Sequence, residues 1–181
     1  MTRWDLGHYT PRKDSAIAPE VWEKLLRLEG RYPWRRGMLV PALMEVAQHH
    51  KWVSRRQMEE LAEFCEVSPT EVMGVATFYT MIYTQPVGDY NIQVCRTLSC
   101  ALCGAERLIE HLKEKLGIGE FETTPDGRFT LTPVECLAAC CGAPVVQINQ
   151  DYYENVTPEK LDEILASLPE KRTLNPKGEA R

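Results

Sequence analysis

The sequence predicts an α+β chain in which an N-terminal helical bundle is followed by a small α/β domain. Apolar residues recur at helical spacing from about residue 17 to residue 83. Turn residues at Gln85–Asp89 then change the pattern, and the alternating stretch Tyr90–Val94 that follows is typical of a strand. The later elements follow the order β-α-β-β-β-α. We therefore expect the bundle at 1–86, the α/β domain at 87–168 and a polar tail at 169–181.

Four short helices are expected in the first part of the chain. Apolar residues three or four positions apart mark their buried faces, because such residues share one side of a helix. The three apolar stripes are Val21, Leu25 and Leu28; Leu39, Leu43 and Val46; and Met58, Leu61, Ala62 and Cys65. Ser54–Gln57 and Ser68–Glu71 have the pattern of a capping box, and Pro69 suits the first helical position. Helices this short must bury these stripes against one another.

The second part of the chain alternates between strand and helix signals. Ala105–Leu116 has the spacing of an amphipathic helix and is closed by Gly117. A last helix is expected after the cap at Thr157–Lys160. Besides Tyr90–Val94, the expected strands are Phe129–Thr132, Val145–Ile148 and Tyr152–Val156. The result is a small α/β sandwich.

Composition and charge narrow the class of protein. The chain has 181 residues, of which 44% are hydrophobic and 26% are charged, as in ordinary globular proteins. No segment approaches the roughly 20 apolar residues of a membrane helix, and the net charge of −5 argues against a nucleic-acid binder. The N-terminus lacks the apolar region of a secretory signal. We expect a cytoplasmic protein with no nucleic-acid partner and no direct membrane insertion.

Six of the seven cysteines lie in two groups. The first group is Cys95, Cys100 and Cys103, and the second is Cys136, Cys140 and Cys141. In a reducing compartment clustered cysteines more often bind metal or do redox chemistry than form disulfides. Four of them are expected at one edge of the sheet: Cys95 and Cys136 at strand ends, Cys100 before a helix, and Cys140 in a loop. Cys103 is expected one turn into that helix as a buried residue, and Cys65 in the core of the bundle.

Spacing alone leaves several kinds of site open. Cys95-x4-Cys100-x2-Cys103 with one distant cysteine matches the plant-type ferredoxin pattern. Alternatively, Cys95 and Cys100 hold one iron while Cys136 and Cys140 hold the other. Structural zinc fits four cysteines almost as well. Cys100-x-x-Cys103 at a helix N-terminus is also compatible with dithiol redox chemistry.

Four stretches together resemble one family. They are Glu71-Val-Met-Gly-Val-Ala-Thr-Phe-Tyr79, Cys95-x4-Cys100, Val134-Glu-Cys-Leu-Ala-Ala-Cys140 and Ala143-Pro-Val-Val-Gln-Ile-Asn149. This set resembles the 24-kilodalton subunit family of NADH:quinone oxidoreductase, respiratory complex I. The resemblance implies a helical bundle followed by a thioredoxin-like [2Fe–2S] ferredoxin domain. Carried onto this chain, the ligands that it implies are Cys95, Cys100, Cys136 and Cys140.

The same resemblance implies a role in electron transfer. The chain would carry one electron as a subunit of complex I, at the inner face of the membrane, and exchange it with the FMN of a partner subunit that also binds NADH. Further iron–sulfur subunits of the peripheral arm would complete the assembly. We expect no catalytic residue here and no activity of the chain alone. A related role in an NAD-linked hydrogenase or formate dehydrogenase stays open. The family usually has glycine where this chain has Ala138.

Overall fold

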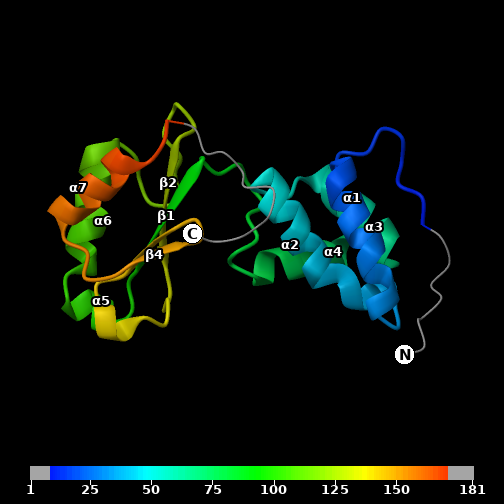
Figure 1. Cartoon of the computed structure of the whole chain (residues 1–181), viewed down its shortest axis with the longest axis horizontal. Coiled ribbons are helices and arrows are strands. Elements are labelled where there is room, and N and C mark those ends of the chain that lie inside the picture. Colours follow the sequence, from blue (N-terminus) through cyan, green and yellow to red (C-terminus); the bar gives the residue numbers. More distant parts are fainter. Residues whose placement is uncertain (1–8, 171–181) are drawn as a thin grey trace. The chain divides into compact units, whose positions relative to one another are not determined.

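The structure is a computed structural model that describes residues 9–170. The chain forms two compact units, Met1–Pro86 and Val87–Arg181, each with its own hydrophobic core (Figure 1). We call them the helical unit and the sheet unit. The predicted polar tail lies outside the described residues from 171 onward. None of the described helices is long and apolar enough to cross a membrane.

The helical unit contains the four predicted helices, and α3 and α4 start at the predicted caps Ser54 and Ser68. They are α1 (Pro19–Leu28), α2 (Leu39–His50), α3 (Arg55–Cys65) and α4 (Pro69–Phe78), with short 3-10 turns η1 (Glu29–Arg31) and η2 (Arg35–Met38) between α1 and α2. Ser54 forms a full capping box with Gln57, because each side chain bonds the backbone N–H of the other. Proline occupies the first turn of both α1 and α4, where its missing N–H costs nothing.

The core of the helical unit is formed by the apolar stripes that the sequence indicates. Leu25, Leu43, Leu61 and Phe64 have no exposed surface. Cys65 is also fully buried among them, and this burial raises the pKa of its thiol to about 12. The prediction that Cys65 is a core residue is therefore confirmed.

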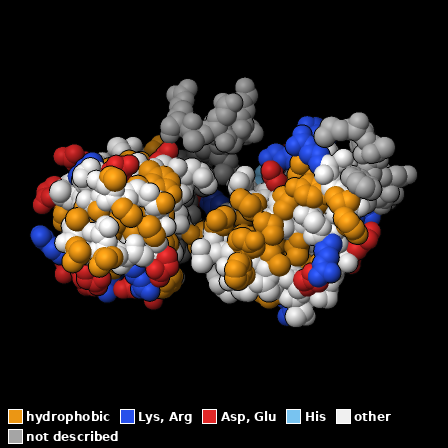
Figure 2. Space-filling view, turned by 90° about the horizontal axis from the view of Figure 1, so that it is seen from below, with side chains coloured by type: hydrophobic (Ala, Val, Ile, Leu, Met, Phe, Trp, Pro, Cys, Tyr) orange, Lys and Arg blue, Asp and Glu red, His pale blue; other side chains and the backbone are white. Residues whose placement is uncertain are grey.

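Several large hydrophobic side chains of the helical unit are exposed instead of buried. Trp34 is 70% exposed, Phe78 at the end of α4 is 76% exposed, and Met81 is 58% exposed. Figure 2 shows hydrophobic side chains gathered on one face of this unit, at the right of the view. Clustered exposed apolar side chains are typical of surfaces that contact another protein.

The sheet unit is built on a mixed sheet with the strand order β2-β1-β3-β4. Its strands are β1 (Tyr90–Cys95), β2 (Phe129–Val134), β3 (Val146–Ile148) and β4 (Asp151–Tyr153). β1 and β2 are parallel, whereas β3 and β4 add as antiparallel strands. β4 ends at Tyr153 and not at the predicted Val156, because Asn155 has a positive φ of 50° and turns the chain out of the sheet.

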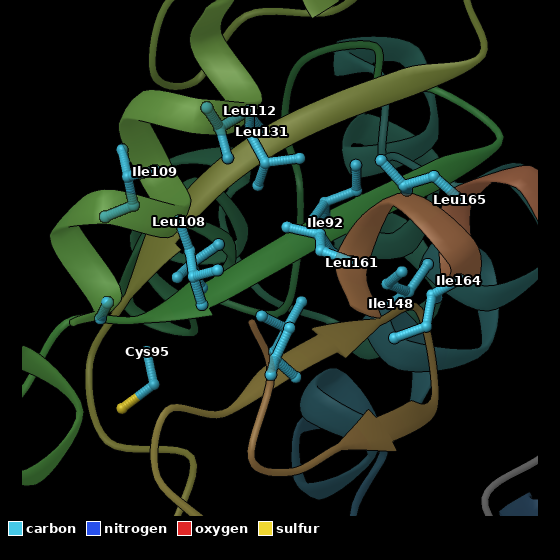
Figure 3. Packing of buried hydrophobic residues seen from close by; sticks show 14 of the residues in the cluster. Ile92, Cys95, Leu108, Ile109, Leu112, Leu131, Ile148, Leu161, Ile164 and Leu165 are labelled. Carbon is cyan, nitrogen blue, oxygen red and sulfur yellow. The ribbon is translucent and has the colours of Figure 1, made fainter. Parts of the chain in front are cut away.

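Three helices accompany the sheet: α5 (Leu98–Leu102), α6 (Ala105–Leu116) and α7 (Pro158–Ser167). α6 has the bounds that the sequence predicts, and α6 and α7 lie on the same side of the sheet (Figure 1). Their apolar faces meet the inward residues of β1 and β2 in one core, whose side chains Figure 3 shows. Ile92, Leu108, Leu131 and Leu161 are among its buried members.

The predictions for Cys100 and Cys103 were wrong in detail. Cys100 lies inside the short helix α5 and not before a helix. Gly104, at a φ of 99°, separates α5 from α6, and only glycine adopts this conformation readily. Cys103 therefore sits in the turn between the two helices, where it is exposed and not buried.

Candidate functional site

The sheet topology places two cysteine loops at one edge of the sheet. β1 and β2 run parallel with Cys95 opposite Val134, so both strands end at this edge. The first loop, which runs from the end of β1 into α5 (residues 95–100), and the second loop, which follows β2 (residues 135–142), therefore leave the sheet side by side. Cys95 closes β1 at the margin of the core, and its sulfur points away from the labelled leucine and isoleucine side chains (Figure 3).

The first loop carries two buried thiols, since Cys95 is 2% exposed and Cys100 is 1% exposed. Burial by itself would raise the pKa of Cys95, but hydrogen bonds from the Thr97 hydroxyl and from backbone N–H groups of Leu137 and Thr97 outweigh it and lower the pKa. Burial raises the pKa of Cys100 to about 11, and a hydrogen bond with Cys95 adds to the effect. The two thiols thus form one interacting pair.

Cys136 and Cys140 of the second loop are both exposed. The sulfur atoms of Cys136 and Cys140 are 3.8 Å apart, and the backbone N–H of Ala138 donates to the Cys136 sulfur at 3.3 Å. The hydrogen bond with Cys136, and then its negative charge, raise the pKa of Cys140. The charge of Cys95 in the first loop acts in the same direction. All four thiols therefore form one electrostatically connected group, made of a buried pair and an exposed pair.

Ala138 has a φ of 61°, in the left-handed region that glycine prefers. This conformation lets the chain turn back between Cys136 and Cys140 so that the Ala138 N–H points at sulfur. The family resemblance indicated only that glycine usually occupies this position. The structure shows that the position has the left-handed conformation that favours glycine.

The end of the second loop is braced by the segment that follows β4. The Asn155 N–H donates to the Gly142 carbonyl at 2.6 Å, and the Val156 N–H donates to the Pro144 carbonyl at 3.1 Å. Gly142 is buried so closely that a Cβ added there would lie 2.6 Å from the Cβ of Glu154. Sequence reasoning missed this role of Gly142, for which the only signal is a glycine directly after the second cysteine group.

The remaining cysteines of the sheet unit differ from this group in their surroundings. Cys103 lines a separate hollow of about 340 Å³ together with Arg107, Pro144 and Thr157. Cys141 is exposed in the 3-10 turn η3 (Cys140–Gly142). Both are accessible thiols beside the four-thiol group.

The four-thiol group fits an iron–sulfur cluster chemically. Thiolates are the ligands of [2Fe–2S] clusters, and N–H and O–H donors aimed at the sulfurs suit the negative charge that such a cluster carries. Among residues 9–170, no three His, Cys, Asp or Glu side chains are placed around a single metal ion. A [2Fe–2S] cluster is compatible with this, because its four ligands divide into two on each iron.

Comparison with known proteins identifies the family of the chain. Residues 26–169 match the family model described as thioredoxin-like [2Fe–2S] ferredoxin. The chain is 44% identical over 145 residues to an NADH-quinone oxidoreductase subunit of Rhizobium meliloti, covering 80% of this chain and 86% of that protein. It is 48% identical over 141 residues to NADH-quinone oxidoreductase subunit 2 of Thermus thermophilus, covering 76% of this chain and 78% of that protein.

A solved structure supports the fold. The chain superimposes with a TM-score of 0.64 and 22% identity on a chain of an NAD⁺-reducing [NiFe]-hydrogenase in the H2-reduced state. The match covers 73% of this chain but only 23% of the hydrogenase chain, so it concerns the fold alone. The family match over residues 26–169 and the two relatives agree with the resemblance found in the sequence. The chain belongs to the thioredoxin-like [2Fe–2S] ferredoxin family.

Proposed function

We propose that this chain is a one-electron carrier of NADH-quinone oxidoreductase, with a [2Fe–2S] cluster held by Cys95 and Cys100 on one iron and by Cys136 and Cys140 on the other. The observation that carries the proposal is the arrangement of these four thiols in two pairs at the shared end of two parallel strands. The relatives named as parts of NADH-quinone oxidoreductase support the choice of complex.

The cluster would supply one-electron redox chemistry, and the chain's own groups would set how easily that electron is accepted. Backbone N–H groups of Leu137 and Ala138 point at the sulfurs of Cys95 and Cys136, so they favour the more negative, reduced state. Burial of the Cys95 pair keeps water from one side and opposes reduction. The exposed Cys136 pair provides a side from which an electron can arrive across a short distance.

The chain needs partners to oxidise NADH. Its sequence contains no dinucleotide-binding glycine motif after a strand, so FMN and NADH belong to a partner subunit in this proposal. Further iron–sulfur subunits would complete the peripheral arm at the cytoplasmic face of the inner membrane. The exposed Trp34, Phe78 and Met81 of the helical unit are suited to contact one of these proteins.

A test of the proposal begins with the purified chain. We expect two irons and two sulfides per chain, visible absorption that bleaches with dithionite, and an EPR signal of one unpaired electron after reduction. The chain alone should not oxidise NADH, whereas the complex isolated with its flavoprotein should. A colourless chain with stoichiometric zinc would instead favour a structural zinc site. A metal-free chain that reduces insulin disulfides would favour dithiol chemistry at Cys100 and Cys103.

The choice of complex needs a separate measurement. Native mass spectrometry of the complex purified from its source should identify a flavin-containing, NADH-binding protein and further components of NADH-quinone oxidoreductase. Finding a hydrogenase or formate dehydrogenase component instead would keep the electron-carrier role but assign it to a different enzyme.

A further inference from the structure

Thr97 stands at the start of α5 but does not cap it. The side chains of Ser54, Ser68 and Thr157 cap α3, α4 and α7, each by accepting a hydrogen bond from the backbone N–H three residues later. Thr97 occupies the same position of α5, yet its side chain makes no such bond. Its hydroxyl is therefore available for another partner, and losing it removes no helix cap.

That partner is the sulfur of Cys95. The Thr97 Oγ1 lies 3.4 Å from the Cys95 Sγ, within hydrogen-bonding range for sulfur. Between two neutral groups either atom could donate. A thiolate bound to iron carries no proton, so the Thr97 hydroxyl must then be the donor.

We propose that Thr97 raises the reduction potential of the cluster by donating its hydroxyl hydrogen bond to the Cys95 sulfur. This inference rests on the proposed function. One-electron reduction would break no bond and would add one negative charge to the cluster that the four thiolates would hold. A donor at a ligand sulfur is attracted more strongly by the reduced state, so it makes reduction easier.

The position of Thr97 makes its bond more influential than a similar bond at the exposed pair. Cys95 is 2% exposed, so no water can replace a lost hydroxyl there without rearrangement. Cys136 also accepts a hydrogen bond, from the Ala138 N–H at 3.3 Å, but that residue is exposed and water competes for its sulfur. The hydroxyl is moreover a side-chain donor, so substitution removes it while the backbone donors of Leu137 and Thr97 to Cys95 remain.

The test compares three variants of Thr97 in the full chain with its cluster. Thr97→Val keeps the size and branching of the side chain but loses the hydroxyl, Thr97→Ser keeps the hydroxyl, and Thr97→Ala is a smaller variant without it. Midpoint potentials are measured by EPR-monitored redox titration, and iron and sulfide content are measured on each sample. We expect the midpoint potentials of Thr97→Val and Thr97→Ala to lie about 59 mV below the wild-type potential. This is a tenfold shift of a one-electron equilibrium, which is the size of effect expected from one hydrogen bond to a charged group.

The control variant decides between a hydroxyl effect and a packing effect. Thr97→Ser should stay close to the wild-type potential. The inference is overturned if Thr97→Val and Thr97→Ala keep the wild-type potential with a full cluster. It is also overturned if the potential of Thr97→Ser falls as far as the potentials of the two hydroxyl-free variants. Loss of the cluster in both hydroxyl-free variants would also overturn it, because Thr97 would then be needed for assembly and not for tuning. A wild-type chain without iron would instead refute the proposed function.

Discussion

Replacing Ala138 by glycine should stabilise the loop that carries Cys136 and Cys140. Ala138 has a φ of 61°, and a residue with a Cβ in the left-handed region costs about 1 to 2 kcal/mol. Glycine removes this cost but gives the unfolded chain more freedom, which costs about 0.5 to 1 kcal/mol. The difference leaves a net gain of about 0 to 1.5 kcal/mol in the free energy of unfolding.

Ala139 provides a matched control. It is the next residue, but its φ is −108°, so glycine there relieves no strain and should lower the free energy of unfolding by roughly 0.5 to 1 kcal/mol. Both variants should be measured by urea unfolding of the apo chain, followed in the sheet unit. The rate at which each variant loses its cluster in air would show whether the loop itself is the part that changes. Equal destabilisation by Ala138→Gly and Ala139→Gly would refute the reasoning, because strain would then play no part.

Two further predictions concern the surroundings of the site. Gly142→Ala should destabilise the sheet unit by about 1 to 3 kcal/mol in urea unfolding, because the new Cβ would meet Glu154; an unchanged midpoint would contradict the close approach. Asp162 accepts a hydrogen bond from His111 at 2.7 Å, which, with other nearby groups, lowers the pKa of Asp162 below its ordinary value of 3.8. Its contribution is present above the unfolded pKa and is lost as the pH falls through the lower folded pKa. Asp162→Asn should therefore cost less than about 1 kcal/mol at about pH 7, and this cost should fall as the pH drops through the folded pKa of Asp162. A cost that does not change with pH would exclude the charge of the Asp162 carboxylate as its cause.

Local sequence signals predicted the long elements well because those elements depend on local chemistry. The cap at Ser54 and the spacing of Ala105–Leu116 each place a helix start at the residue where the structure has it. The helix α5 escaped prediction because five residues are too few for a periodic pattern. Cys103 was misplaced for the same reason: without α5, the turn at Cys103 and Gly104 between two helices was not expected.

The location of the candidate site could be predicted from the sequence, but the arrangement and burial of its thiols could not. Two cysteine groups after two strands indicated a site at one edge of the sheet, and the parallel pairing of β1 and β2 is what brings their ends together. The sequence alone could not separate buried from exposed thiols, because burial depends on how the loops pack. The hydrogen bond between Gly142 and Asn155 joins two backbone groups, so no side chain in the sequence could have predicted it.

The central claim is that four particular cysteines hold the cluster, and iron content with EPR of single serine variants tests it most directly. Serine replaces a soft thiolate by a hydroxyl that ionises poorly, so each change at a ligand should lose the cluster or strongly alter its spectrum. We expect this result at Cys95, Cys100, Cys136 and Cys140, and an unchanged spectrum at Cys103 and Cys141. Loss of the cluster in Cys103→Ser, together with an intact cluster in Cys136→Ser, would contradict the two-plus-two arrangement and favour the plant-type pattern.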